Sequence, residues 1–169
     1  MQHRSTPDHE VAKRAQSADQ VKPNKREGGH AVLERIERSE ALPATISATQ
    51  AFESVMGALI QRLPAEVAAE FVERRLPAEL SALLQRDADE ALEEGVQGDL
   101  ADYLDEVGGQ LELSQAQARE IVDVVIGSLR LLMSAEEVDA IARELSPQLC
   151  SMWIRASNVP GAPGLSGTP

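Results

Sequence analysis

The side chains of this chain that could do chemistry are mostly carboxylates, and they gather in the middle of the sequence. Carboxylates attract basic groups, bind divalent cations and, when their pKa values are perturbed, transfer protons. A Ca²⁺ loop starting at Asp87 is excluded, because Ala91 and Leu92 take its fifth and sixth places, where a ligand and a glycine belong. We interpret the segment as a solvated acidic connector that receives a basic partner, with weak divalent-cation binding and a catalytic role as alternatives. The acidic connector comprises Asp87, Asp89, Glu90, Glu93, Glu94, Asp99 and Asp102.

Other reactive residue types are scarce. No histidine follows His30, so no imidazole serves a hydrolytic triad, a phosphorelay or a helical di-iron site in the rest of the chain. The single cysteine, Cys150, is too few for a zinc site, and its apolar neighbours indicate a small core residue. No glycine-rich phosphate-binding loop is present. The sequence therefore predicts a protein that is not an enzyme, with no catalytic residue, no cofactor and no metal.

The charge of the chain limits its partners. The formal net charge is −12, and residues 1–30 carry six basic and four acidic side chains, which leaves about −14 on the remainder. Such a charge disfavours nucleic-acid backbones and anionic membranes. One cysteine excludes an internal disulfide, and the first thirty residues lack the apolar stretch of a signal peptide. We expect a cytoplasmic protein that binds neither nucleic acid nor membrane.

Apolar residues recur at helical spacing between the two ends of the chain. One stripe runs from Ala51 to Leu63 and another from Ile121 to Met133. These stripes, with a composition rich in residues of good helix propensity, predict an all-α helical bundle. Residues 1–29 and 157–169 are rich in Gly, Pro and polar residues, and we expect them to be disordered tails. The expected helices span about 31–41, 47–63, 65–75, 77–86, 98–111, 115–133, 135–145 and 147–156.

Capping residues mark several helix starts. Ser47, Ser114 and Ser134 each stand three residues before a Gln or Glu, which is the pattern of a capping box. Ser146 precedes Pro147, and we interpret this pair as an N-cap followed by a proline at the first helical position.

The two apolar stripes match each other when the sequence is shifted by 70 positions. The shift pairs Gly57 with Gly127 and Pro77 with Pro147, and a shift of 71 aligns the first helix of each half. A glycine inside a helix costs roughly 1 kcal/mol relative to alanine, so we expect both glycines to mark close helix–helix contacts. We predict two tandem related four-helix units, 30–96 with the acidic connector and 97–156, which together form one compact domain.

Three segments resemble a known family: Leu59-Ile-Gln-Arg-Leu63, Arg75-Leu-Pro-Ala-Glu-Leu80 and the run from Glu144 to Trp153. In this order and spacing they are similar to the bacterial domain of unknown function 2267 (DUF2267). The resemblance covers about residues 31–156, and the chain departs from the pattern at Ser146, where a leucine is usual. The resemblance implies a helical fold, and it implies no activity, because the family has no assigned catalytic residues.

Three functions remain open from the sequence. The first is a non-enzymatic interaction or regulatory module whose acidic helical body binds a protein or basic peptide. The alternative is a small-molecule or metal-binding helical protein with a pocket between the two units. The third is a structural or self-associating protein that forms homo-oligomers.

Overall fold

The protein is described by a computed structural model that covers residues 25–91, 93, 95–96 and 98–157. Over these residues it forms α-helices and no strand, which confirms the predicted all-α fold. A π-helical segment, Phe71–Arg75, follows α4, and a 3₁₀ turn, Arg130–Leu132, follows α7. The α-helices are α2 (Lys25–Glu37), α3 (Ala48–Ile60), α4 (Ala65–Glu70), α5 (Ala78–Asp89), α6 (Leu100–Leu111), α7 (Gln115–Leu129), α8 (Ala135–Ala142) and α9 (Pro147–Ser157).

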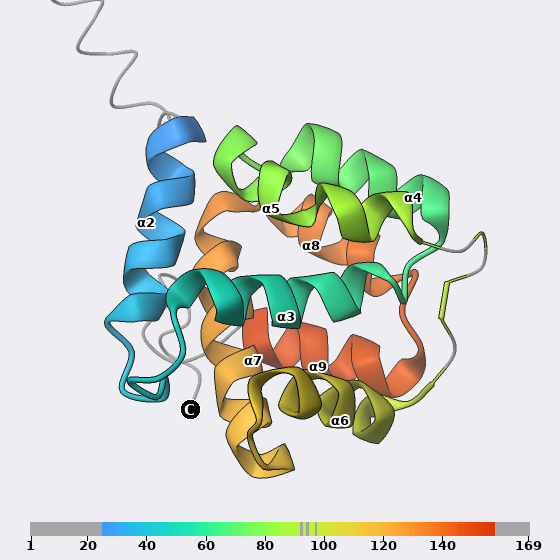
Figure 1. The fold of residues 1–169 in the computed structure, drawn as a ribbon. Helices are drawn as coiled ribbons and strands as arrows, with labels where there is room; N and C mark the ends of the chain where they lie inside the picture. Colours follow the sequence, from blue (N-terminus) through green and yellow to red (C-terminus); the bar gives the residue numbers. More distant parts are fainter. Residues whose placement is uncertain (1–24, 92, 94, 97, 158–169) are drawn as a thin grey trace, which may run out of the picture.

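Helices α3 and α7 lie at the centre of the bundle (Figure 1). Helix α3 packs on α2, α5, α6 and α7, and α7 packs on α2, α3, α6 and α9. Helix α2 of the first predicted unit therefore packs on α7 of the second, and α6 of the second unit packs on α3 of the first. A single cluster of buried residues includes both Val32 and Ala156. The two predicted units thus share one core, and their origin by duplication stays a prediction.

The first described helix begins earlier than the sequence predicts. We expected a disordered tail to residue 29 and a helix over 31–41, but α2 spans Lys25–Glu37 and includes Gly28 and Gly29. Both glycines are buried. A Cβ on Gly28 would lie 2.9 Å from Leu132 Cδ2, and one on Gly29 would lie 3.3 Å from Glu79 Cβ. The glycine pair therefore permits close packing of α2 and does not break the helix. Our expectation for residues 1–24 and 158–169 lies outside the described residues.

The predicted capping boxes at Ser47, Ser114 and Ser134 are all formed. A fourth box, which the sequence analysis missed, joins Asp99 and Asp102 at the start of α6. Helix α9 begins at Pro147, as predicted. The hydroxyl of Ser146, however, is buried and has no hydrogen-bond partner within the described part of the chain, so the predicted side-chain cap is not made.

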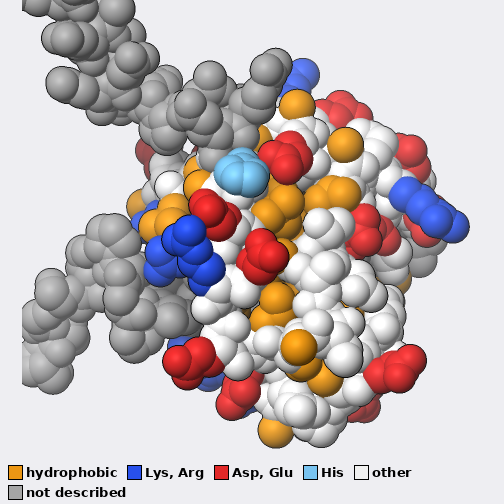
Figure 2. Space-filling view, turned by 60° about the vertical axis from the view of Figure 1, so that its left-hand side comes forward, with side chains coloured by type: hydrophobic (Ala, Val, Ile, Leu, Met, Phe, Trp, Pro, Cys, Tyr) orange, Lys and Arg blue, Asp and Glu red, His pale blue; other side chains and the backbone are white. Residues whose placement is uncertain are grey.

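On the side of α2, separate acidic side chains are scattered among neutral and apolar ones, and basic side chains occupy fewer places (Figure 2). Within the described ranges, no helix has the length and apolar character needed to cross a membrane. Cys150 is a free, half-buried thiol packed against the core, in agreement with its predicted role as a small apolar residue.

Candidate functional site

The residues of the acidic connector are divided between the end of α5, the segment that follows it and the start of α6. Helix α5 extends to Asp89, three residues beyond its predicted end, so Asp87 and Asp89 are helical. Asp89 is exposed and accepts a hydrogen bond of 3.2 Å from Gln85 Nε2. Glu90 lies 3.5 Å from Arg86 Nε. Glu93 is exposed, and Glu94 lies outside the described residues.

The two remaining carboxylates of the connector have a structural role that explains their position. Asp99 accepts a hydrogen bond of 3.0 Å from the backbone N–H of Asp102, and Asp102 accepts one of 3.1 Å from the N–H of Asp99. These bonds satisfy backbone donors at the start of α6. The seven predicted partner-binding residues are thus divided, and only Asp87 and Glu90 line the same cavity.

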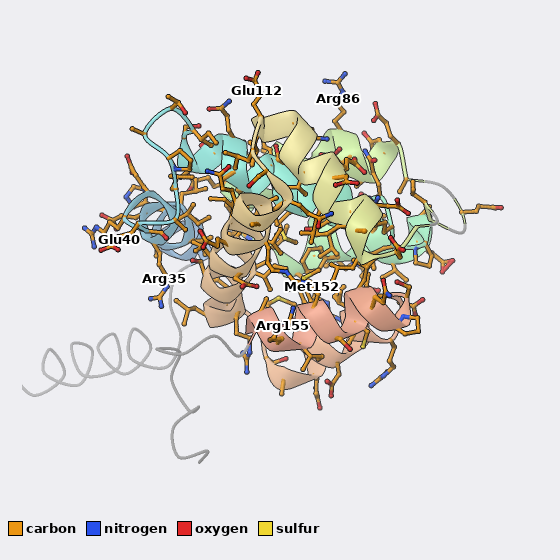
Figure 3. All side chains as sticks on the ribbon, turned by 90° about the horizontal axis from the view of Figure 1, so that it is seen from below. Arg35, Glu40, Arg86, Glu112, Met152 and Arg155 are labelled. Carbon is orange, nitrogen blue, oxygen red and sulfur yellow. The ribbon has the colours of Figure 1, made fainter. Side chains whose placement is uncertain are left out.

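That cavity has a volume of about 310 Å³ and lies between α3, α5 and α6. Its walls are mainly polar, with amide side chains from Gln61 and Gln110 and one basic residue, Arg86. The Arg86 side chain is 87% exposed. Figure 3 shows it pointing away from the body of the protein. We call the cavity the acidic pocket, after its four carboxylates, Glu53, Asp87, Glu90 and Glu106.

The Asp87 carboxylate is packed on the backbone of α3 at Gly57. A Cβ on Gly57 would lie 2.6 Å from Asp87 Oδ2, so the carboxylate would have to move if residue 57 carried a side chain. Gln61 Nε2 donates a 2.9 Å hydrogen bond to the other oxygen, Asp87 Oδ1. The sequence predicts a close helix–helix contact at Gly57. The close contact is present, but the group that makes it is a carboxylate.

Burial of the Asp87 carboxyl group raises its pKa above the usual value. The hydrogen bond from Gln61 opposes this effect, and the negative charge of Glu90 adds to it. The charged form of Asp87 is therefore only partly compensated by the protein. A cation in the acidic pocket would favour ionisation of Asp87.

A buried arginine, Arg62, contacts two of the residues that line the pocket, Ala58 and Glu106. The Arg62 side chain is only 4% exposed, and its Nη1 donates hydrogen bonds to Glu106 Oε1 at 2.9 Å and to the carbonyl of Ala58 at 3.0 Å. Its guanidinium lies 5.4 Å from the centre of the Tyr103 ring. Arg62 is paired with Glu106, and the exposed Arg86 is paired with Glu90, which leaves Glu53 and Asp87 as the pocket carboxylates without an arginine partner among the described residues.

Tyr103, on α6, contacts both Arg62 and the backbone of α3. Its hydroxyl donates a hydrogen bond of 2.9 Å to the carbonyl of Val55, and its side chain is fully buried. Burial raises the pKa of Tyr103, so the phenol stays neutral. Sequence reasoning missed the Arg62–Tyr103 pair. One feature of the sequence could have pointed to Arg62. The shift of 70 positions aligns it with Leu132, so an arginine stands where the other half of the predicted repeat has an apolar residue.

Gly57→Ala is expected to lower the free energy of unfolding by about 1 kcal/mol, because the new methyl group displaces Asp87 and breaks its hydrogen bond to Gln61. In an Asp87→Ala background, Gly57→Ala should instead raise the free energy of unfolding by about 0.5–1 kcal/mol, since alanine is a better helix former than glycine. Urea unfolding of the four proteins measures both effects. Additive effects of the two substitutions would show that the carboxylate does not need the glycine.

The acidic pocket has the side chains of a cation-binding site. Carboxylates and amide oxygens accept hydrogen bonds from ammonium and guanidinium groups. No three His, Cys, Asp or Glu side chains are grouped closely enough to hold a metal ion among the residues that the structure describes. The pocket therefore presents oxygen acceptors of the kind that ammonium and guanidinium groups bind.

A comparison with protein families finds one match, to the family described as "Uncharacterized conserved protein (DUF2267)", over residues 29–152. No curated protein and no solved structure gives a significant match. The family match agrees with the resemblance seen in the sequence and covers most of the chain. The chain therefore belongs to the DUF2267 family.

Proposed function

We propose that this chain is a non-enzymatic binding module whose acidic pocket receives a lysine or arginine side chain of a basic protein partner. The observation that carries the proposal is the excess of carboxylates in one cavity. Four of them line it, and arginines pair with only two, Arg62 with Glu106 and the largely exposed Arg86 with Glu90. This refines the interaction function expected from the sequence and moves its site from the connector to the pocket.

The charge of the whole chain supports the same type of partner. A net charge of −12 produces a field that attracts basic surfaces and increases their rate of association. This field decays over about 10 Å at 0.1 M salt, so binding should weaken as salt is added. The half-buried Asp87 adds a short-range contribution. Because burial raises the pKa of Asp87, its proton is lost at higher pH than usual, and binding should weaken as the pH falls through that pKa.

A basic probe tests the site before any natural partner is known. We expect the triple variant Glu53→Gln, Asp87→Asn, Glu90→Gln to bind an octalysine peptide at least about tenfold more weakly than the wild type, because it removes the charges that contact the ammonium groups. Isothermal titration calorimetry at low and high salt measures this affinity.

A matched variant separates the pocket from the overall field. Glu73→Gln, Asp139→Asn, Glu144→Gln removes the same residue types from exposed positions outside the pocket. Its affinity for octalysine should stay within about threefold of the wild type, since distant surface charges are screened. Equal losses in the two triple variants would mean that the probe responds to net charge alone. That outcome would remove the pocket from the proposal.

A further inference from the structure

A second cavity lies on the second half of the chain, between α6, the start of α7 and α9. Its volume is about 550 Å³, within the range of small-molecule sites. The apolar part of its wall comes from Leu100, Leu104 and Met152. Two arginines, Arg119 and Arg155, line it together with amide and hydroxyl groups. We call this cavity the α6–α9 groove.

Helices α6 and α9, which line the groove, contact each other less than α2 and α5, which correspond to them under the predicted repeat. The shift that aligns the first helix of each half pairs Gly29 with Leu100, and the shift of 70 pairs Pro77 with Pro147. In the first half, a Cβ on Gly29 would lie only 3.4 Å from Pro77 Cβ, so α2 and α5 are in close contact. In the second half, Leu100 and Pro147 both line the groove instead, and the contact between α6 and α9 is less extensive. Where the first half has a closely packed glycine, the second half thus has a leucine that contributes to the apolar wall of the groove.

The two arginines in the groove are available to a ligand. Both are exposed, and neither forms an ion pair with any other residue that the structure describes. They lie near Asp123 on α7, whose Oδ1 is buried and has no hydrogen-bond partner in the described part of the chain. Burial raises the pKa of Asp123, and the charges of Arg155 and Arg119 act against that rise. The arginines are thus close to a carboxylate without being paired to it, on a chain that is otherwise strongly acidic.

The groove has different chemistry at its two ends. Asp99 lies at the start of α6, where the backbone N–H of Leu100 also donates a 3.1 Å hydrogen bond to Gln148 Oε1 on α9. Arg155 lies near the end of α9, about 12 Å from Pro147 along the helix axis. Figure 3 shows Met152 and Arg155 on α9, and Met152 is almost fully buried. The apolar wall therefore separates an acidic end from a basic end.

We propose that the α6–α9 groove binds a small organic acid with one carboxylate and an apolar body. The carboxylate would be held by Arg119 and Arg155, and the apolar body would cover Leu100, Leu104 and Met152. Asp99 at the other end would repel a second carboxylate, so monocarboxylates should bind better than dicarboxylates. This site is separate from the acidic pocket, and each of the two proposals can fail without the other.

Three probes separate the parts of this proposal: octanoate, octanamide, which has the same chain without the charge, and acetate, which has the charge without the chain. We expect octanoate to bind at least about tenfold more tightly than either of the others, because only octanoate uses both the arginines and the apolar wall. Calorimetry gives the affinities. The ¹³C methyl signal of Met152 should shift with octanoate, whereas that of Met56, which lies in α3 outside the groove, should not.

The double variant Arg119→Gln, Arg155→Gln should lose at least about tenfold in octanoate affinity. The matched double variant Arg74→Gln, Arg143→Gln, which changes exposed arginines outside the groove, should keep wild-type affinity. Octanamide binding as tightly as octanoate, or equal losses in the two double variants, would overturn the proposal. It would also be overturned if a peptide with a free C-terminal carboxylate bound while octanoate did not, since the groove would then serve a peptide and not a small acid.

Discussion

Arg62→Ala is expected to lower the free energy of unfolding by about 3 kcal/mol. The substitution removes the ion pair to Glu106, the hydrogen bond to the Ala58 carbonyl and the packing against the Tyr103 ring. It also leaves a cavity between α3 and α6, because the arginine side chain is almost fully buried. Urea unfolding followed by circular dichroism at pH 7 measures the loss.

A second variant shows whether the charge of Arg62 or its volume supports the fold. Arg62 Nε is buried without a hydrogen-bond partner in the described residues, so part of the cost of burying the guanidinium is not repaid. Replacing a buried ion pair by apolar residues of similar size is often neutral. We therefore expect Arg62→Leu with Glu106→Gln to unfold within about 1 kcal/mol of the wild type. If Arg62→Ala itself lowered the free energy of unfolding by less than about 1 kcal/mol, the contacts of Arg62 with Glu106, Ala58 and Tyr103 would not be important for stability.

Trp153→Ala is expected to cause the largest loss of stability, about 4 kcal/mol. The Trp153 side chain is 1% exposed. Its Nε1 donates a hydrogen bond of 2.9 Å to the carbonyl of Val138, which joins α9 to α8. The alanine variant loses both the apolar contacts and the partner of a buried carbonyl. Thermal and urea unfolding of the variant measure the loss.

Leu83 provides the matched control for Trp153, because it stands 70 positions earlier in the sequence. It is only half-buried, so Leu83→Ala should cost about 1–2 kcal/mol. If the two alanine variants lost comparable free energy of unfolding, the account in which Trp153 contributes more because it is more deeply buried than Leu83 would be contradicted.

The helical class and most helix positions could be predicted from the sequence because they depend on local signals. The stripe from Ala51 to Leu63 and the capping residues Ser47, Ser114 and Ser134 act within one or two turns of helix. The same local rules failed at Gly28 and Gly29. Glycine pairs commonly end helices, and only the packing of α2 on Leu132 and Glu79 shows why these two are retained inside one.

The acidic pocket could be predicted only in part, because contacts between distant segments determine it. The density of carboxylates pointed to Asp87 and Glu90, but Glu53 and Glu106 come from helices far away in the sequence. Arginines are usually exposed, so the sequence gives no reason to expect Arg62 in the interior. Its place there depends on contacts with a distant segment, such as the Tyr103 ring on α6. Asp99 and Asp102 form the capping box of α6, a role that the density of charge alone did not indicate, and their binding of a partner stays a prediction.

The most direct test of the central claim is a map of ¹H–¹⁵N chemical-shift changes during titration with octalysine at low salt. If a basic group enters the acidic pocket, the largest changes should be at Gly57, Gln61 and Asp87, which surround it, and they should diminish as salt is added. Changes that are largest on α9, or that spread evenly over the acidic surface without a maximum at the pocket, would contradict the proposed function.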